Sequence, residues 1–117
     1  MAKRTDKLGR QLQKDLGEIL DSAAQQLLNS TLVTVLDVEV TPDLGLAKVY
    51  LSFFQSTDKQ ADLETLRNHL PQIRHYLAGK LKNQVRKIPE LMLFIDDTID
   101  QAEHMENLLR QLREKKD

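Results

Sequence analysis

The chain contains no cysteine and no tryptophan, and it has few glycines, prolines and aromatic residues. The absence of cysteine excludes disulfides, thiolate metal sites and thiol catalysis. No apolar run approaches the roughly 20 residues that a membrane-spanning helix needs, and the N-terminal Met-Ala-Lys-Arg-Thr-Asp lacks the apolar core of a signal peptide. We therefore expect a soluble, cytoplasmic protein without a membrane partner.

Motifs of enzyme active sites are also missing. The sequence has no Gly-rich phosphate loop, no nucleophile elbow and no His-Glu metal motif, and its three histidines share no ligand spacing. Aromatic residues make up only 4% of the chain, too few for the stacking platforms of RNA-recognition sheets, so we interpret Tyr50 as structural. These absences argue against an enzyme, a cofactor, a bound metal or a small-molecule substrate.

The length of the chain and its lack of linkers predict one domain over residues 1–117. No Gly-, Ser- or Pro-rich segment divides the 117 residues, and a chain of this length buries about two thirds of its unfolded surface. Hydrophobic residues make up 40% and charged residues 30%, which excludes a disordered chain. We expect a monomer with a real core.

The N-terminal half predicts a helix followed by a β-hairpin. Apolar residues at steps of three and four form one stripe and predict a helix from about residue 4 to residue 28. Gly17 interrupts this helix, and we suggest that close packing on a sheet is the reason for a glycine there. Residues 31–40 and 46–54 are strand-like and flank the turn sequence Thr41-Pro42-Asp43-Leu44-Gly45. The first strand changes parity between Val35 and Leu36, which indicates either a bulge or burial of both faces.

The C-terminal half predicts a broken helix, a third strand and a last helix. One apolar stripe runs through residues 63–81, but Pro71 lies inside it, so the helix should end and restart with Pro71 at the first position of the new helix. Residues 91–95 predict a strand, and Thr98 begins a capping-box spacing before a helix that reaches Leu112. The third strand must cross over to reach the hairpin. The fold class is therefore α+β, in the order αββααβα, with a three-stranded sheet and helices on one face.

Cationic side chains are unevenly distributed in a chain whose formal net charge is −1. Six of them and no carboxylate lie between Glu64 and Glu90, and the outer side of the first helix carries a second basic group. A positive field on one side of a nearly neutral molecule suits a polyanion such as RNA, although a solvated helix face is the alternative. For Gly79, close approach of a ligand, a helix C-cap and packing stay open. The candidate RNA-binding residues are Lys3, Arg4, Lys7, Arg10, Lys14, Arg74, Lys80, Lys82, Arg86 and Lys87.

Short segments in a fixed order carry a family resemblance. They are Val33-Thr34-Val35, Val38-Glu39-Val40, Asp43-Leu44, Ala47-Lys48-Val49-Tyr50, Ile73-Arg74, and Pro89-Glu90-Leu91 with Phe94 and Asp96 to Thr98. Together they resemble the bacterial ribosome-binding factor A family over nearly the whole chain. The resemblance implies a type-II KH-like fold, binding to the immature small (30S) ribosomal subunit and its rRNA, and a role in late maturation and processing of 16S rRNA, especially in the cold.

One common KH feature is absent. No two of the four glycines lie three residues apart, so the chain lacks the Gly-x-x-Gly loop that approaches phosphates in conventional KH domains. We expect recognition through RNA shape and through contacts of cations with phosphates. Where the family tends to have Ala-x-Gly at the break between helices, this chain has His69-Leu70-Pro71. The alternative function is a protein-protein adaptor that uses the last helix and the acidic hairpin (Asp37, Glu39 and Asp43) without contacting RNA.

Overall fold

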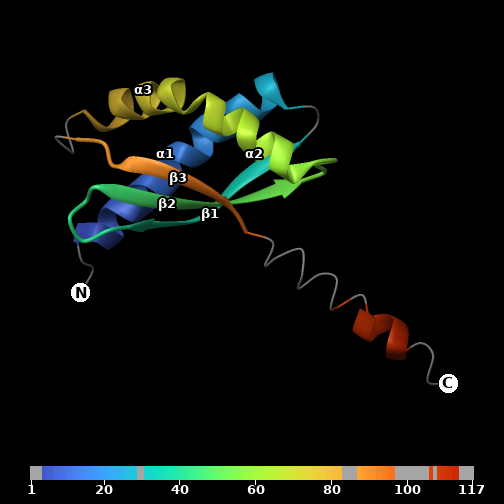
Figure 1. The fold of residues 1–117 in the computed structure, drawn as a ribbon. Coiled ribbons are helices and arrows are strands. Elements are labelled where there is room, and N and C mark those ends of the chain that lie inside the picture. The colour runs from blue at the N-terminus through green and yellow to red at the C-terminus, as the bar shows by residue number, and fades with distance from the viewer. Residues whose placement is uncertain (1–3, 29–30, 83–86, 97–105, 107, 114–117) are drawn as a thin grey trace.

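The computed structural model describes residues 4–28, 31–82, 87–96, 106 and 108–113. The elements follow the order α1 (Arg4–Leu27), β1 (Leu32–Val40), β2 (Leu46–Phe54), α2 (Lys59–Asn68), α3 (Leu70–Leu81) and β3 (Glu90–Ile95) (Figure 1). This order confirms the α+β prediction through the third strand. Of the predicted last helix, residues 106 and 108–113 are helical, and the segment 97–105 that would begin it lies outside the described residues. No described helix is long and apolar enough to cross a membrane.

The three strands form one mixed sheet in the order β1-β2-β3. β1 and β2 are the antiparallel arms of the predicted hairpin, whereas β3 pairs in parallel with β2 after the crossover through α2 and α3. Val35 pairs with Leu51 but Asp37 pairs with Tyr50, so Leu36 is the extra residue of a bulge. The bulge, and not burial of both faces, explains the change of parity in β1.

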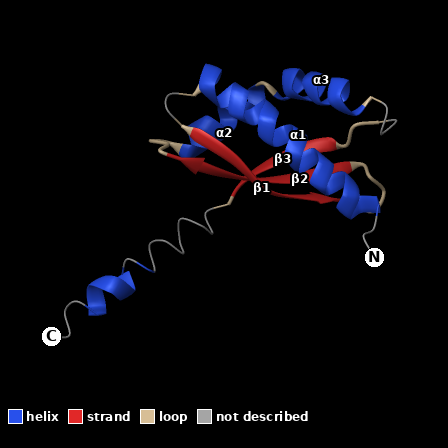
Figure 2. Cartoon of the chain, turned by 180° about the vertical axis from the view of Figure 1, so that it is seen from behind, coloured by secondary structure: helices blue, strands red, loops and turns tan. Residues whose placement is uncertain are grey.

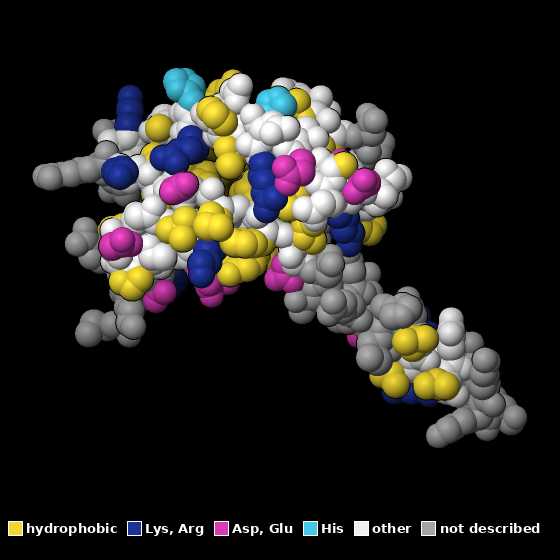
Figure 3. All heavy atoms as spheres, viewed as in Figure 1, with side chains coloured by type: hydrophobic (Ala, Val, Ile, Leu, Met, Phe, Trp, Pro, Cys, Tyr) yellow, Lys and Arg dark blue, Asp and Glu magenta, His cyan; other side chains and the backbone are white. Residues whose placement is uncertain are grey.

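α1, α2 and α3 cover one face of the sheet, and the core lies between the two layers (Figure 2). Leu12, Leu16 and Leu20 of α1 are fully buried against alternate residues of the strands, such as Val49 and Leu51. The opposite face of the sheet is open in the described part of the chain. Figure 3 looks onto this side, where hydrophobic side chains gather over the strands and both acidic and basic side chains lie around them.

The helix break lies at His69, within two residues of Pro71 as predicted. α2 ends at Asn68 and α3 begins at Leu70, so Pro71 is the second residue of the new helix and not the first. Proline is tolerated there because the first amides of a helix have no intrahelical acceptor. The imidazole Nδ1 of His69 lies 2.8 Å from the carbonyl oxygen of Thr65, which ties the break to the preceding turn.

Two glycines of α1 have different surroundings, and the suggested reason for Gly17 is wrong. A Cβ atom built on Gly17 would meet nothing within 4 Å, so no sheet packs against it. A Cβ on Gly9 would lie 2.9 Å from the carbonyl oxygen of Val38, which is backbone and cannot easily move away. The close contact between α1 and the sheet is therefore made at Gly9.

Candidate nucleic-acid interface

The described cations of the predicted site lie on α1, on α3 and after α3. Lys7, Lys14, Lys82 and Lys87 are exposed, and none of them forms an ion pair with any residue that the structure describes. Exposed amines without an ion-pair partner are suited to contact phosphates. Lys3, Arg86 and the side chain of Arg4 lie outside the described part, so their places in the site stay predictions.

The two basic groups meet at a single carboxylate. The Nζ of Lys80 on α3 lies 2.6 Å from Oε2 of Glu18 on α1. The hydrogen bond from Lys80, the charge of Lys80 and the charge of Lys14 all lower the pKa of Glu18, and the same hydrogen bond raises the pKa of Lys80. Both side chains therefore stay charged at neutral pH. Glu18 ties Lys80 of α3 to α1 and also neutralises part of the positive charge there, which the acid-free stretch of sequence around Lys80 did not reveal.

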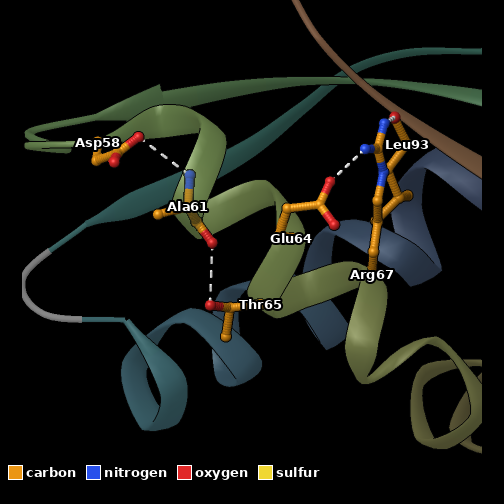
Figure 4. Close-up of polar contacts among 6 residues, drawn as sticks. All are labelled: Asp58, Ala61, Glu64, Thr65, Arg67 and Leu93. Carbon is orange, nitrogen blue, oxygen red and sulfur yellow. Dashed lines mark hydrogen bonds and ion pairs between the residues drawn. The ribbon is translucent and has the colours of Figure 1, made fainter.

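Arg74 and Arg67 donate hydrogen bonds to backbone carbonyls. Arg74 is half-buried, and its Nη2 lies 3.2 Å from the carbonyl oxygen of Ile88 just before β3. Arg67 bridges Oε1 of Glu64 at 2.6 Å and the carbonyl oxygen of Leu93 at 2.9 Å, so it fastens α2 to the outer edge of β3 (Figure 4). Of the six cations in the acid-free stretch, these two hold the fold together, and phosphate binding by Arg74 stays a prediction.

Arg10 lies at the other edge of the sheet, in mixed electrostatic surroundings. It lines a hollow of about 540 Å³ between the start of α1 and β1, together with Asp6, Asp37, Glu39 and Lys48. Neighbouring carboxylates reduce the positive field of this arginine, because opposite charges within a Debye length partly cancel. Its contribution to an anion-binding surface is therefore smaller than that of the exposed lysines.

Tyr76 was not among the sequence candidates, although it lies on α3 beside the lysines. Its side chain is 66% exposed, and its ring centroid lies 6.0 Å from that of His75. Tyr76, Gly79 and Lys80 line one side of a groove of about 710 Å³ between α3 and α1. Gly79 packs against nothing within 4 Å and does not have a positive φ, so neither packing nor a left-handed cap explains it. An exposed ring beside a cation offers a surface on which a nucleobase can stack.

Tyr50 has the structural role that the sequence predicts. Its ring stacks on Phe94 of the neighbouring strand, with centroids 5.6 Å apart, and its hydroxyl donates to Glu39. Within the described residues, no three His, Cys, Asp or Glu side chains are grouped so as to hold a metal ion.

The fold defines a class: a small KH-like domain that lacks a Gly-x-x-Gly loop and has exposed lysines on α1, on α3 and after α3. The family model of ribosome-binding factor A matches residues 4–109. A ribosome-binding factor A from Chlorobium luteolum is 42% identical over 114 residues, which cover 97% of this chain and 94% of that protein. The chain belongs to the ribosome-binding factor A family.

A crystal structure and a fitted homology model share the fold. The crystal structure of ribosome-binding factor A from Thermus thermophilus matches with a TM-score of 0.65 at 22% identity, covering 80% of this chain and 97% of that one. The second is a homology model of the Thermus thermophilus protein that was fitted into a cryo-EM map of a 30S complex with that factor. It matches with a TM-score of 0.61 at 23% identity and covers 75% of this chain and 90% of that one. Ribosome-binding factor A structures are KH-like, so the fold prediction is confirmed.

Proposed function

We propose that this protein binds immature small ribosomal subunits through their rRNA and promotes late maturation and processing of 16S rRNA in the cytoplasm. Membership of the ribosome-binding factor A family supports ribosome binding. The Thermus thermophilus relative fitted into a 30S complex supports the small subunit as the partner. The protein acts as a monomer and by binding alone, without catalysis.

The observation that supports the RNA-binding part is the set of exposed lysines on α1, on α3 and after α3. Glu18 is paired with Lys80 and its pKa is lowered by the charge of Lys14, while Lys7 on α1 and Lys82 and Lys87 after α3 are exposed as well. Lysine amines bind phosphates without reading base identity, so this surface suits recognition of a folded RNA backbone by shape. Tyr76 adds a stacking position for an unpaired base.

A binding protein without catalysis can change an RNA only through differential affinity. It shifts the particle toward the conformation that it binds best, and the shift cannot exceed the difference in binding free energy between the two conformations. Such a shift matters most when misfolded RNA is kinetically trapped, as at low temperature. We therefore expect the protein to bind immature subunits in preference to mature ones and to be needed most in the cold.

Deletion of the gene tests this role. At low growth temperature, the deletion strain should grow slowly and accumulate unprocessed small-subunit rRNA precursor, as measured by rRNA end-mapping and sucrose-gradient profiles. Re-expression of the intact chain is the control and should restore both. Precursor levels and subunit ratios that match the parent strain at both temperatures would contradict the assembly role and favour the adaptor function.

A further inference from the structure

The open face of the sheet presents ordered rows of side chains that the RNA-binding surface does not use. Across the strands, Glu39 lies beside Lys48 and Lys48 beside Met92, and the next row is formed by Asp37, Tyr50 and Phe94. These residues alternate with the buried ones and lie on the face of the sheet opposite the core, and Asp37, Glu39 and Lys48 also line the hollow beside the start of α1.

This face is unusually apolar for a surface in contact with water. The side chains of Leu32, Phe54 and Met92 are 52%, 54% and 43% exposed, and the stacked rings of Tyr50 and Phe94 lie between them. Exposed aromatic rings, methionine and leucine on one face of a sheet are typical of an interaction site. Figure 3 shows this gathering of hydrophobic side chains over the strands.

The strands that form this face carry more acids than cations, although Lys and Arg side chains of neighbouring segments also surround them (Figure 3). Asp37, Glu39 and Glu90 lie on it, and Lys48 is the one cationic residue in the three strands. Tyr50 lies among these acids, since its hydroxyl donates to Oε2 of Glu39 at 3.2 Å. Burial, this hydrogen bond, and the charges of Glu39, Asp37 and Asp96 all raise the pKa of Tyr50. An excess of acids repels RNA and attracts cations.

The geometry also limits how a partner can approach. Each edge of the sheet is contacted at one point by a helix side chain, because Gln13 donates to the carbonyl oxygens of Val35 and Leu36, and Arg67 donates to that of Leu93. Addition of a partner strand to an edge would have to displace these bonds. The open face is the more accessible surface.

We infer that the open face of the sheet docks a Lys/Arg-rich segment of a small-subunit protein, whose apolar side chains cover the Tyr50–Phe94 stack while its cations pair with Asp37, Glu39 and Glu90. This inference rests on the proposed function, since it takes the partner from the same particle. The protein would then bridge rRNA on its helical side and a basic protein on its sheet side.

Site-specific photo-crosslinking to purified small subunits separates the two surfaces. One full-length variant carries benzoylphenylalanine at Met92, and the matched variant carries it at Lys82 on the helical side. The Met92 adduct should be sensitive to protease and resistant to nuclease, and mass spectrometry should map it to a Lys/Arg-rich segment. The Lys82 adduct should be sensitive to nuclease. Circular dichroism confirms that both variants are folded.

Charge substitutions on the same face give a second measurement. Glu90→Lys should lower the yield of the Met92 crosslink several-fold and leave the Lys82 crosslink unchanged, whereas Asp21→Lys on α1 makes the same change of charge and should leave the Met92 crosslink intact. Any of four results would overturn the inference and leave the proposed function standing. Three concern the Met92 adduct, which could form with RNA, with a second copy of this chain or with an acidic segment. The fourth is that Met92 gives no adduct while Lys82 crosslinks to rRNA. No adduct from either position would contradict both.

Discussion

At the scale of single residues, the contact between α1 and β1 depends on the absence of one methyl group. Gly9 lets the helix approach so closely that a Cβ atom there would lie 2.9 Å from the carbonyl oxygen of Val38. One turn further along the helix, Gln13 donates to the carbonyl oxygens of Val35 and Leu36 at the bulge. The position of the basic helix on the sheet is therefore set by these two small contacts, one steric and one polar.

Alanine substitutions at the two helical glycines should have opposite effects on stability. Gly9→Ala forces a shift of backbone at a cost of about 1–3 kcal/mol, which outweighs a gain in helix propensity of about 1 kcal/mol. Gly17→Ala obtains the propensity gain without a clash, since nothing lies within 4 Å of its Cβ. Urea unfolding of both variants measures the difference. A Gly9→Ala protein as stable as the Gly17→Ala protein would contradict the close contact.

At the scale of elements, several boundaries could be predicted from sequence because the responsible chemistry is local. Proline at position 71 breaks the helix at His69, and the change of parity after Val35 marks the bulge at Leu36. The pairing of Glu18 with Lys80 could not be predicted, because the packing of α1 against α3 creates it between distant parts of the chain. The sequence around Gly9 and Gly17 also could not show which of the two glycines lies against the backbone of β1, because that contact depends on how α1 packs on the sheet.

The ion pair between α1 and α3 should regulate the strength of the basic surface more than the stability of the fold. Exposed ion pairs contribute little to folding, but Glu18→Gln releases Lys80 for one more phosphate contact. Association with small subunits should tighten, and its dependence on salt should steepen by about 0.7–0.9 per added contact in a plot of log affinity against log salt concentration.

Asp21→Asn is the matched control for this substitution, because it removes one exposed negative charge from the same helix and Asp21 has no ion pair with a described residue. Its effect on the salt slope should be clearly smaller than that of Glu18→Gln. Equal slopes for the two variants would mean that only net charge matters and that Lys80 is not held back by its partner.

At the scale of the whole molecule, a net charge of −1 does not describe how the charges are distributed over the elements. The lysines of α1 and α3 lie on the helical side, and the acids of the hairpin lie largely on the sheet side. Asp43 of the hairpin turn is engaged locally, since its carboxylate accepts hydrogen bonds from Thr41 and Gly45, which lower its pKa. We therefore expect removal of a lysine of the proposed RNA-binding surface to weaken the salt dependence of subunit binding. Removal of a cation outside that surface should leave the salt dependence unchanged.

The salt dependence of subunit binding tests this separation with two double variants of equal net charge. Lys14→Gln with Lys82→Gln removes two exposed cations from the proposed RNA-binding surface, and each lost phosphate contact should flatten the salt slope by about 0.7–0.9. Lys48→Gln with Lys59→Gln removes two cations from β2 and the start of α2 and should leave the slope unchanged. Affinity is measured by sedimentation with purified small subunits across a range of salt concentrations. If both pairs flatten the slope equally, rRNA senses only the overall charge of the protein, and binding by an oriented helical surface is wrong.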